Sequence, residues 1–194
     1  MMRIIAGTHR GRRIFSIPKD KFVKPISARI RQSTFDIIRP WLPGANFLDL
    51  FAGCGTVGLE ALSRGAAKAV FVEKAGICMK TIERNIAALG FGDRAKAWKA
   101  DIMAGDLKWL AKGADYEGYD IIFMGVPYRL EDNTPLYFST PVLAKAAAAG
   151  ITTPETLFVV QHHVKESVEP PENVENYRTE AYGDTVVDYF RFKK

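Results

Sequence analysis

Hydrophobic and polar positions form two recurring patterns along this chain. Short apolar runs rich in β-branched and aromatic residues predict strands over residues 46–51, 68–73, 95–100, 119–124 and 156–162. Between these runs, apolar residues recur every three or four positions, which predicts helices over residues 56–64, 75–89, 103–111 and 141–149. Strands that alternate with helices in this way favour a mostly parallel sheet with helices on both faces.

The pattern changes at the C-terminal end of the chain. Residues 176–182 and 185–192 are β-like runs on either side of Gly183-Asp184. This arrangement predicts an antiparallel hairpin that closes the sheet. We therefore expect residues 27–194 to form one α/β domain with a Rossmann-like fold.

The N-terminal segment is predicted to form a small hairpin of its own. Arg3–Ala6 and Arg13–Ile17 are short β-like runs around Gly7–Gly11. Residues 1–26 would therefore be an arm that precedes the main domain.

The first predicted helix follows this arm. Ser27 is a suitable N-cap for a helix over residues 28–39, and proline follows at position 40. The apolar positions of this helix leave Arg29 and Arg31 to face outward.

A glycine-rich turn follows the strand over residues 46–51. Gly53, Gly55 and Gly58 lie in or just after this turn, and Glu73 ends the next strand, twenty residues after Gly53. Glycines allow a tight turn and a close approach to a ligand, while the helix N-terminus offers free N–H groups. The later acid accepts hydrogen bonds from ribose hydroxyls. The combination predicts a site for a nucleoside cofactor.

Asp49, at the end of the first of these strands, distinguishes between two such cofactors. A carboxylate beside the turn would repel the pyrophosphate of NAD. It would attract the ammonium group of S-adenosylmethionine, whose own carboxylate suits the N–H groups of the helix start. The sign of the charge therefore favours S-adenosylmethionine, although Asp49 can also be explained as a residue that caps a turn.

The third strand end adds a candidate contact to the adenine ring. Asp101 could accept a hydrogen bond from the adenine amino group while the N–H of Ile102 meets a ring nitrogen. An N-cap for the following helix explains Asp101 equally well. The predicted cofactor-binding residues are Asp49, Ala52, Gly53, Gly55, Glu73, Lys74, Asp101 and Ile102.

Positive charge is concentrated at the N-terminal end. The chain has a net charge of +5, and residues 1–31 contain nine Lys and Arg residues against one acidic residue, Asp20. The remaining 163 residues therefore carry a net charge of −3. A basic arm on a mildly acidic domain predicts a polyanionic partner, and arginine suits contacts with nucleic acid. The predicted RNA-binding residues are Arg3, Arg10, Arg12, Arg13, Arg29 and Arg31.

Composition argues against several other classes of protein. Hydrophobic residues make up 47% and charged residues 25%, which is typical of a soluble globular protein, and no apolar run has the length of a membrane span. The N-terminus lacks the apolar segment of an export signal. Cys54 and Cys78 lack metal-ligand spacing, and His162, His163 and Glu166 are not a complete ligand set. We expect a cytoplasmic monomer without a metal or a membrane partner.

These features resemble those of a known enzyme family. The resemblance rests on Arg3–Gly7, Arg10–Arg12, Lys24–Arg31, Leu48–Gly55, Gly58–Arg64, Glu73 and Tyr182–Thr185. Over nearly its full length the chain resembles the guanine-N2 methyltransferases of small-subunit ribosomal RNA. The resemblance implies a class I methyltransferase fold with an N-terminal hairpin and S-adenosylmethionine as the methyl donor. It also implies a guanine amine in ribosomal RNA, or in an assembling small ribosomal subunit, as the acceptor.

The fourth strand end departs from the pattern of such families, which carry Asp or Asn, two prolines and an aromatic residue there. This chain has Gly125-Val126-Pro127-Tyr128. In the family motif, the acid and a backbone carbonyl accept the amine hydrogens and localise the nitrogen lone pair, while the aromatic ring stacks on the extruded base. The resemblance makes Gly125, Val126, Pro127 and Tyr128 the candidate catalytic residues. A buried strand that ends in a proline turn is the structural alternative.

Gly125 has no side-chain acceptor, and losing one such partner costs about a hundred- to a thousand-fold in rate. Asp120, Glu131 and Asp132 are the candidate replacements. Two other functions therefore stay open, namely a weakened or inactive RNA-binding assembly factor and an amino-methyltransferase for another base in DNA or RNA. An NAD-linked oxidoreductase is disfavoured by Asp49.

Overall fold

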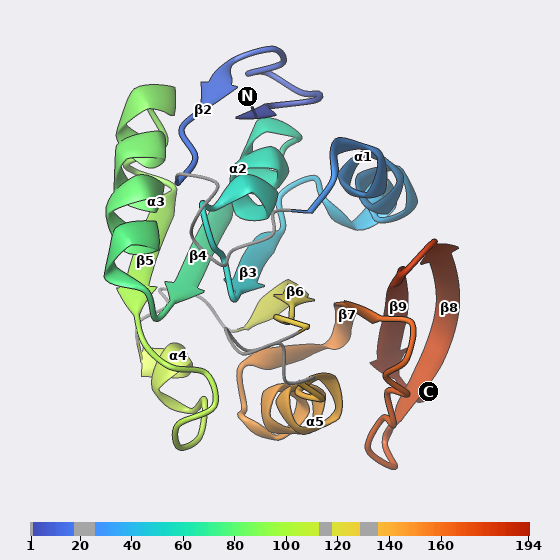
Figure 1. The fold of residues 1–194 in the computed structure, drawn as a ribbon. Helices are drawn as coiled ribbons and strands as arrows, with labels where there is room; N and C mark the ends of the chain where they lie inside the picture. The colour runs from blue at the N-terminus through green and yellow to red at the C-terminus, as the bar shows by residue number, and fades with distance from the viewer. Residues whose placement is uncertain (1, 18–25, 113–117, 129–135) are drawn as a thin grey trace.

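A seven-stranded sheet with the order β5-β4-β3-β6-β7-β9-β8 forms the centre of the molecule (Figure 1). The structure, a computed structural model, describes residues 2–17, 26–112, 118–128 and 136–194. The strands are β3 (Asn46–Leu50), β4 (Lys68–Glu73), β5 (Ala95–Lys99), β6 (Tyr119–Gly125), β7 (Thr152–His163), β8 (Val174–Tyr182) and β9 (Thr185–Phe192). Neighbours among β3 to β7 pair in parallel, whereas β9 pairs antiparallel with β7 and β8. The predicted fold class is confirmed.

Helices cover both faces of this sheet (Figure 1). One face packs against α1 (Ala28–Ile37), α2 (Thr56–Ser63) and α3 (Gly76–Leu89), and the other against α4 (Trp109–Lys112) and α5 (Ser139–Ala148). A short 3-10 helix, η1 (Arg39–Trp41), follows α1. Side chains of a strand alternate between the faces, so Phe47 belongs to the core under α1–α3 and Leu48 to the core under α4 and α5.

The strand order reverses between β3 and β6. From β3 the chain builds outward through β4 to β5, and it then returns to the other side of β3 to form β6. In sheets of this kind, ligands bind at the carboxyl ends of the strands that flank such a reversal. The fold therefore places the predicted glycine turn and the segment after β6 at one ligand-binding edge.

Two predicted helices differ from the observed ones. The helix expected over 103–111 is limited to α4, because Asp101 and Asp106 accept hydrogen bonds from the backbone N–H groups of Met103 and Lys108 at 2.9 and 3.0 Å. Such local side-chain bonds stabilise turns at the expense of a helix. The helix α5 begins at Ser139, two residues before the expected start at Pro141.

The predicted N-terminal hairpin is present as β1 (Met2–Arg3) and β2 (Arg13–Ile14), paired antiparallel. The loop of this hairpin lies against α2, where the N–H of Thr8 donates to the carbonyl oxygen of Ser63 at 2.8 Å. A Cβ atom on Gly7 would lie 1.8 Å from that same oxygen, so the close contact requires glycine.

The prediction that Arg31 faces outward is wrong. Its side chain is 3% exposed, and its Nη2 donates to the carbonyl oxygen of Arg3 at 2.6 Å. Its Nε lies 3.7 Å from Oε2 of the fully buried Glu60 on α2. Arg31 therefore joins α1 to the hairpin and to α2, and it is withdrawn as a candidate RNA contact.

No helix in the described ranges is both long enough and apolar enough to span a membrane.

Candidate cofactor and base pocket

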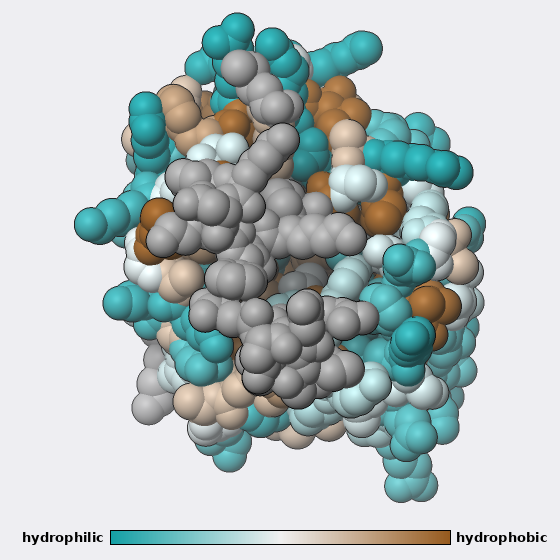
Figure 2. Space-filling model, in the orientation of Figure 1, coloured by the Kyte–Doolittle hydropathy of each residue, from teal (hydrophilic) through white to brown (hydrophobic). Residues whose placement is uncertain are grey.

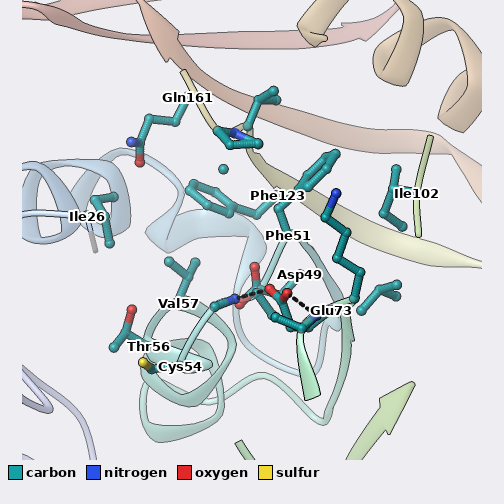
Figure 3. A pocket seen from close by; sticks show the side chains of 18 of the residues that line it. Ile26, Asp49, Phe51, Cys54, Thr56, Val57, Glu73, Ile102, Phe123 and Gln161 are labelled. Carbon is teal, nitrogen blue, oxygen red and sulfur yellow. Dashed lines mark hydrogen bonds between the residues drawn. The ribbon is translucent and has the colours of Figure 1, made fainter. Parts of the chain in front are cut away.

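A cavity of about 540 Å³ lies at the carboxyl ends of β3, β4 and β6 (Figure 3). This volume is in the range of small-molecule sites. One end of the cavity is lined by the glycine turn and by Asp49 and Glu73, and the other by residues 125–128. The structure thus brings seven of the eight predicted cofactor residues and the candidate catalytic segment into a single pocket. The exception is Gly55, which is buried at the start of α2 and does not line the cavity.

The turn after β3 has an unusual backbone. Phe51, Gly53 and Gly55 have φ angles of 63°, 57° and 77°, and Phe51 is the single non-glycine residue with positive φ in the described ranges. The N–H of Ala52 donates to the carbonyl of Val72 at 3.0 Å, which ties the turn to β4. Bulky residues adopt positive φ only where surrounding contacts enforce it, as at many ligand sites.

The carboxylate of Glu73 holds this turn in place. Its Oε2 accepts a hydrogen bond from the N–H of Gly53 at 2.9 Å, and its Oε1 accepts one from the N–H of Ala75 at 2.8 Å. Each carboxylate oxygen can accept a second hydrogen bond. Glu73 lines the cavity, so both oxygens retain capacity for a pair of ribose hydroxyls.

Asp49 lies in the same wall of the pocket, near Glu73 (Figure 3). It is 1% exposed, and its Oδ2 accepts a hydrogen bond from the N–H of Gly58 at 2.9 Å. Burial raises the pKa of Asp49 to about 7; the Gly58 hydrogen bond opposes this shift, and the nearby Glu73 charge adds to it. The site can therefore stabilise a cation placed between the two carboxyl groups.

Gly58 has a packing role that the sequence pattern alone does not reveal. A Cβ atom at this position would lie 2.4 Å from Cε1 of the Phe71 ring. The absence of a side chain thus lets α2 approach β4 closely, which brings the N–H of Gly58 within reach of Asp49.

The predicted adenine end is open to solvent. Asp101 and Ile102 line the cavity, and Lys74 Nζ lies 3.8 Å from Asp101 Oδ2 in an exposed pair. Oδ1 of Asp101 accepts from the N–H of Met103 within a turn. The alternative of an N-cap is wrong, because the next helix, α4, begins only at Trp109. The second oxygen of Asp101 faces an exposed lysine and stays a candidate acceptor for an adenine amino group.

At the other end of the cavity, Gly125, Val126, Pro127 and Tyr128 all contribute to the wall. The hydroxyl of Tyr128 donates to Thr185 Oγ1 at 3.3 Å and accepts from the side-chain amide of Gln161 at 2.7 Å. These bonds hold the phenol ring in a fixed position at the rim of the pocket.

Of the three candidate replacements for a motif acid, the structure describes only Asp120. Asp120 lies at the amino end of β6, where its Oδ2 accepts from the N–H of Asn46 at 2.8 Å, so it is excluded. Glu131 and Asp132 lie outside the described residues.

Sequence reasoning missed several residues that line the cavity, namely Ile26, Phe123, Gln161, His163 and Asp184. Gln161 is the informative one, because it lies directly opposite Gly125 in the parallel pairing of β6 with β7. Only the register between these strands reveals this relation, since 36 positions separate the two residues in the sequence. Within the described part of the chain, no three His, Cys, Asp or Glu residues are grouped as metal ligands.

Five of the six predicted RNA-binding arginines are exposed, and all but one of these belong to the hairpin region. Hydrophilic side chains project from the top of Figure 2, where Figure 1 places this hairpin. Arg3 and Arg12 each also donate to a backbone carbonyl, of Gly11 at 2.7 Å and of Ala88 at 2.9 Å. Whether the surface binds RNA stays a prediction.

Comparison with known proteins gives consistent matches. The family described as "Conserved hypothetical protein 95" matches residues 2–191. A Bacillus subtilis (strain 168) protein named "Putative rRNA methyltransferase YlbH" is 30% identical over 194 residues, which cover 98% of each chain. "Ribosomal RNA small subunit methyltransferase D" of Escherichia coli (strain K12) is 35% identical over 129 residues, 66% of this chain and 61% of that protein. A solved structure titled "Putative methyltransferase yhhF from Escherichia coli" has a TM-score of 0.78 at 26% identity, and the match covers 99% of this chain and 98% of that one.

Proposed function

This chain belongs to the family described as conserved hypothetical protein 95, and on that premise we propose that it is an S-adenosylmethionine-dependent methyltransferase acting on ribosomal RNA. The names of its relatives support ribosomal RNA, and small-subunit RNA in particular, as the substrate. The finer proposal is that the target is the exocyclic N2 amine of a guanine. The observation that carries it is the single cavity that joins Asp49 and Glu73 to the segment 125–128.

The residues at the turn fit S-adenosylmethionine. Glu73 would accept hydrogen bonds from the ribose hydroxyls, and Asp49 would face the ammonium group. Bound there, the cofactor supplies an electrophilic methyl group on a sulfonium, whose sulfur keeps the bonding electrons when the methyl leaves.

The other end of the cavity fits a flat base that carries an amine. The Tyr128 ring would stack on the extruded guanine, and the carbonyl of Val126 would accept one amine hydrogen. Accepting that hydrogen draws the nitrogen lone pair out of conjugation with the base and towards the methyl group. The proton released afterwards can leave to water, because the rim of the cavity includes the exposed Pro127 and Asp184.

The test is transfer of tritium from labelled S-adenosylmethionine to ribosomal RNA and to partly assembled small subunits from cells that lack this protein. We expect label in N2-methylguanosine after digestion of the RNA to nucleosides. Label in a different nucleoside would contradict the proposed base, and label in DNA would contradict the proposed substrate.

A catalytically inactive RNA-binding assembly factor is the second candidate, and Gly125 favours it because this residue has no side-chain acceptor. An inactive assembly factor would bind both the cofactor and RNA but would transfer no label. The same experiment, with binding measured in parallel, distinguishes the two functions.

Replacing Glu73 by glutamine should weaken binding of S-adenosylmethionine by at least about ten-fold, which corresponds to about 1.4 kcal/mol. The amide keeps one acceptor for the N–H groups of Gly53 and Ala75 and loses the second. Isothermal titration calorimetry measures the change. The matched control is Glu83→Gln, an exposed residue on α3, and equal affinity of the two variants would contradict the assignment.

Replacing Arg10, Arg12 and Arg13 by glutamine should flatten the salt dependence of RNA binding. Each lost phosphate contact lowers the slope of log affinity against log salt by about 0.7 to 0.9 units. Filter binding over a series of salt concentrations gives the slope. The same substitution of Lys108, Lys193 and Lys194, which are exposed elsewhere, is the control. An unchanged slope for the arginine variant would show that the hairpin makes no phosphate contact.

A further inference from the structure

Gly125 leaves an unfilled position in the wall of the base pocket. Its φ angle is outside the left-handed region, so its backbone does not require glycine. A Cβ atom there would lie 3.1 Å from Cε1 of Phe123, a contact that a small shift of the ring would relieve. Because residues two apart on a strand share a face and Phe123 lines the cavity, a side chain at position 125 would also point into it.

Gln161 lies next to this position on the neighbouring strand. It is the registered partner of Gly125, and its carbonyl oxygen accepts from the N–H of Val126 at 3.3 Å. Registered side chains of adjacent strands project from the same face, with the strands about 4.8 Å apart. The Gln161 side chain accordingly reaches the cavity that a residue at 125 would have entered (Figure 3).

Hydrogen bonds fix which end of the Gln161 amide is available. A tyrosine hydroxyl has a single hydrogen, and that of Tyr128 is donated to Thr185. In this arrangement the hydroxyl accepts from the amide nitrogen of Gln161, at 2.7 Å. The amide oxygen, Oε1, has no hydrogen-bond partner among the described residues.

We propose that Oε1 of Gln161 is the side-chain acceptor that Gly125 cannot provide. It accepts one hydrogen of the target amine while the carbonyl of Val126 accepts the other. The amide oxygen orients the amine and takes no proton, as the asparagine of the usual motif would. This inference rests on the proposed methyl transfer to a base amine and explains how the pocket retains that activity despite Gly125.

The test compares steady-state kinetics of methyl transfer for four proteins. Gln161→Leu keeps the size of the side chain and removes its acceptor, and we expect kcat to fall by about a hundred-fold. The KM for RNA and the affinity for S-adenosylmethionine should change by less than about two-fold. Adding Gly125→Asn to Gln161→Leu should restore most of kcat, because the asparagine oxygen enters the same part of the cavity. Asn173→Leu, an exposed amide before β8, is the control.

Each outcome bears on the proposal. An unchanged kcat for Gln161→Leu would overturn it, and so would a loss that Gly125→Asn fails to restore, since Gln161 would then have only a structural role. Circular dichroism and thermal unfolding of both variants separate lost folding from lost chemistry. No transfer by the unsubstituted protein would instead contradict the proposed function, on which the inference depends.

Discussion

Replacing Glu60 by alanine is expected to lower the free energy of unfolding by about 3–5 kcal/mol. The carboxylate is fully buried on α2 and accepts hydrogen bonds from the N–H groups of Ile5 and Ala6, at 2.8 and 3.0 Å. It also accepts from Nε of Arg64 at 2.7 Å and lies 3.7 Å from Nε of Arg31. Alanine would leave two backbone donors and Nε of Arg64 without their acceptor, and the buried Arg31 guanidinium without its anion.

Arg31 makes this loss more costly. Burial lowers the pKa of its guanidinium, the neighbouring Glu60 charge raises it, and Arg64 lowers it further. Glu60 is thus the anion that stabilises the buried cation, through an ion pair at 3.7 Å. Nε of Arg31 makes no hydrogen bond within the described part of the structure. A buried charge whose partner is removed destabilises a fold far more than the pair itself stabilises it.

Urea denaturation gives the free energy of unfolding, and Glu83→Gln on the exposed side of α3 is the control. Because Glu60 bonds to the hairpin, we expect limited proteolysis to cleave the Glu60→Ala variant first in residues 2–17. A loss below about 1 kcal/mol would show that the network contributes little to stability.

The arrangement of strands and helices could be predicted from periodicity alone. The runs at 46–51 and 68–73 lie within one residue of β3 and β4, because a central parallel strand is a mostly apolar segment. The helix α4 could not be predicted in the same way. There, short-range hydrogen bonds of Asp101 and Asp106 compete with an otherwise helical pattern.

The candidate site was predicted better than the contacts that build it. Asp49, Glu73 and Tyr128 line one cavity, as expected from their places at strand ends. The role of Glu60 could not be read from the sequence, because its partner Ile5 is 55 positions away. The position of Gln161 likewise depends on strand register. Sequence spacing indicates which strand end a residue occupies, whereas the pairing of distant segments can be seen only in the three-dimensional structure.

Replacing Asp49 by asparagine is expected to weaken S-adenosylmethionine binding by at least about ten-fold and to stabilise the ligand-free protein at pH 8. Burial raises the pKa of Asp49 from 3.8 to about 7, so the folded protein binds a proton there more tightly than the unfolded chain does. That contribution to stability is complete below pH 3.8 and is lost as the pH rises through about 7. At pH 8 the folded protein holds a buried anion, which asparagine removes.

A bound cation reverses the preference of Asp49 for its protonated form, since an ammonium group beside this residue favours the ionised carboxylate. The affinity of the unsubstituted protein for S-adenosylmethionine should therefore rise between pH 6 and pH 8, whereas that of the Asp49→Asn variant should be weaker and flatter over the same range. Calorimetric titration at pH 6, 7 and 8, with urea denaturation of the ligand-free proteins, measures both effects. Asp93→Asn, on the exposed turn before β5, controls for a general change in charge. Full affinity in the Asp49→Asn variant would show that Asp49 serves only to hold the N–H of Gly58, and that the ammonium group is bound elsewhere in the cavity.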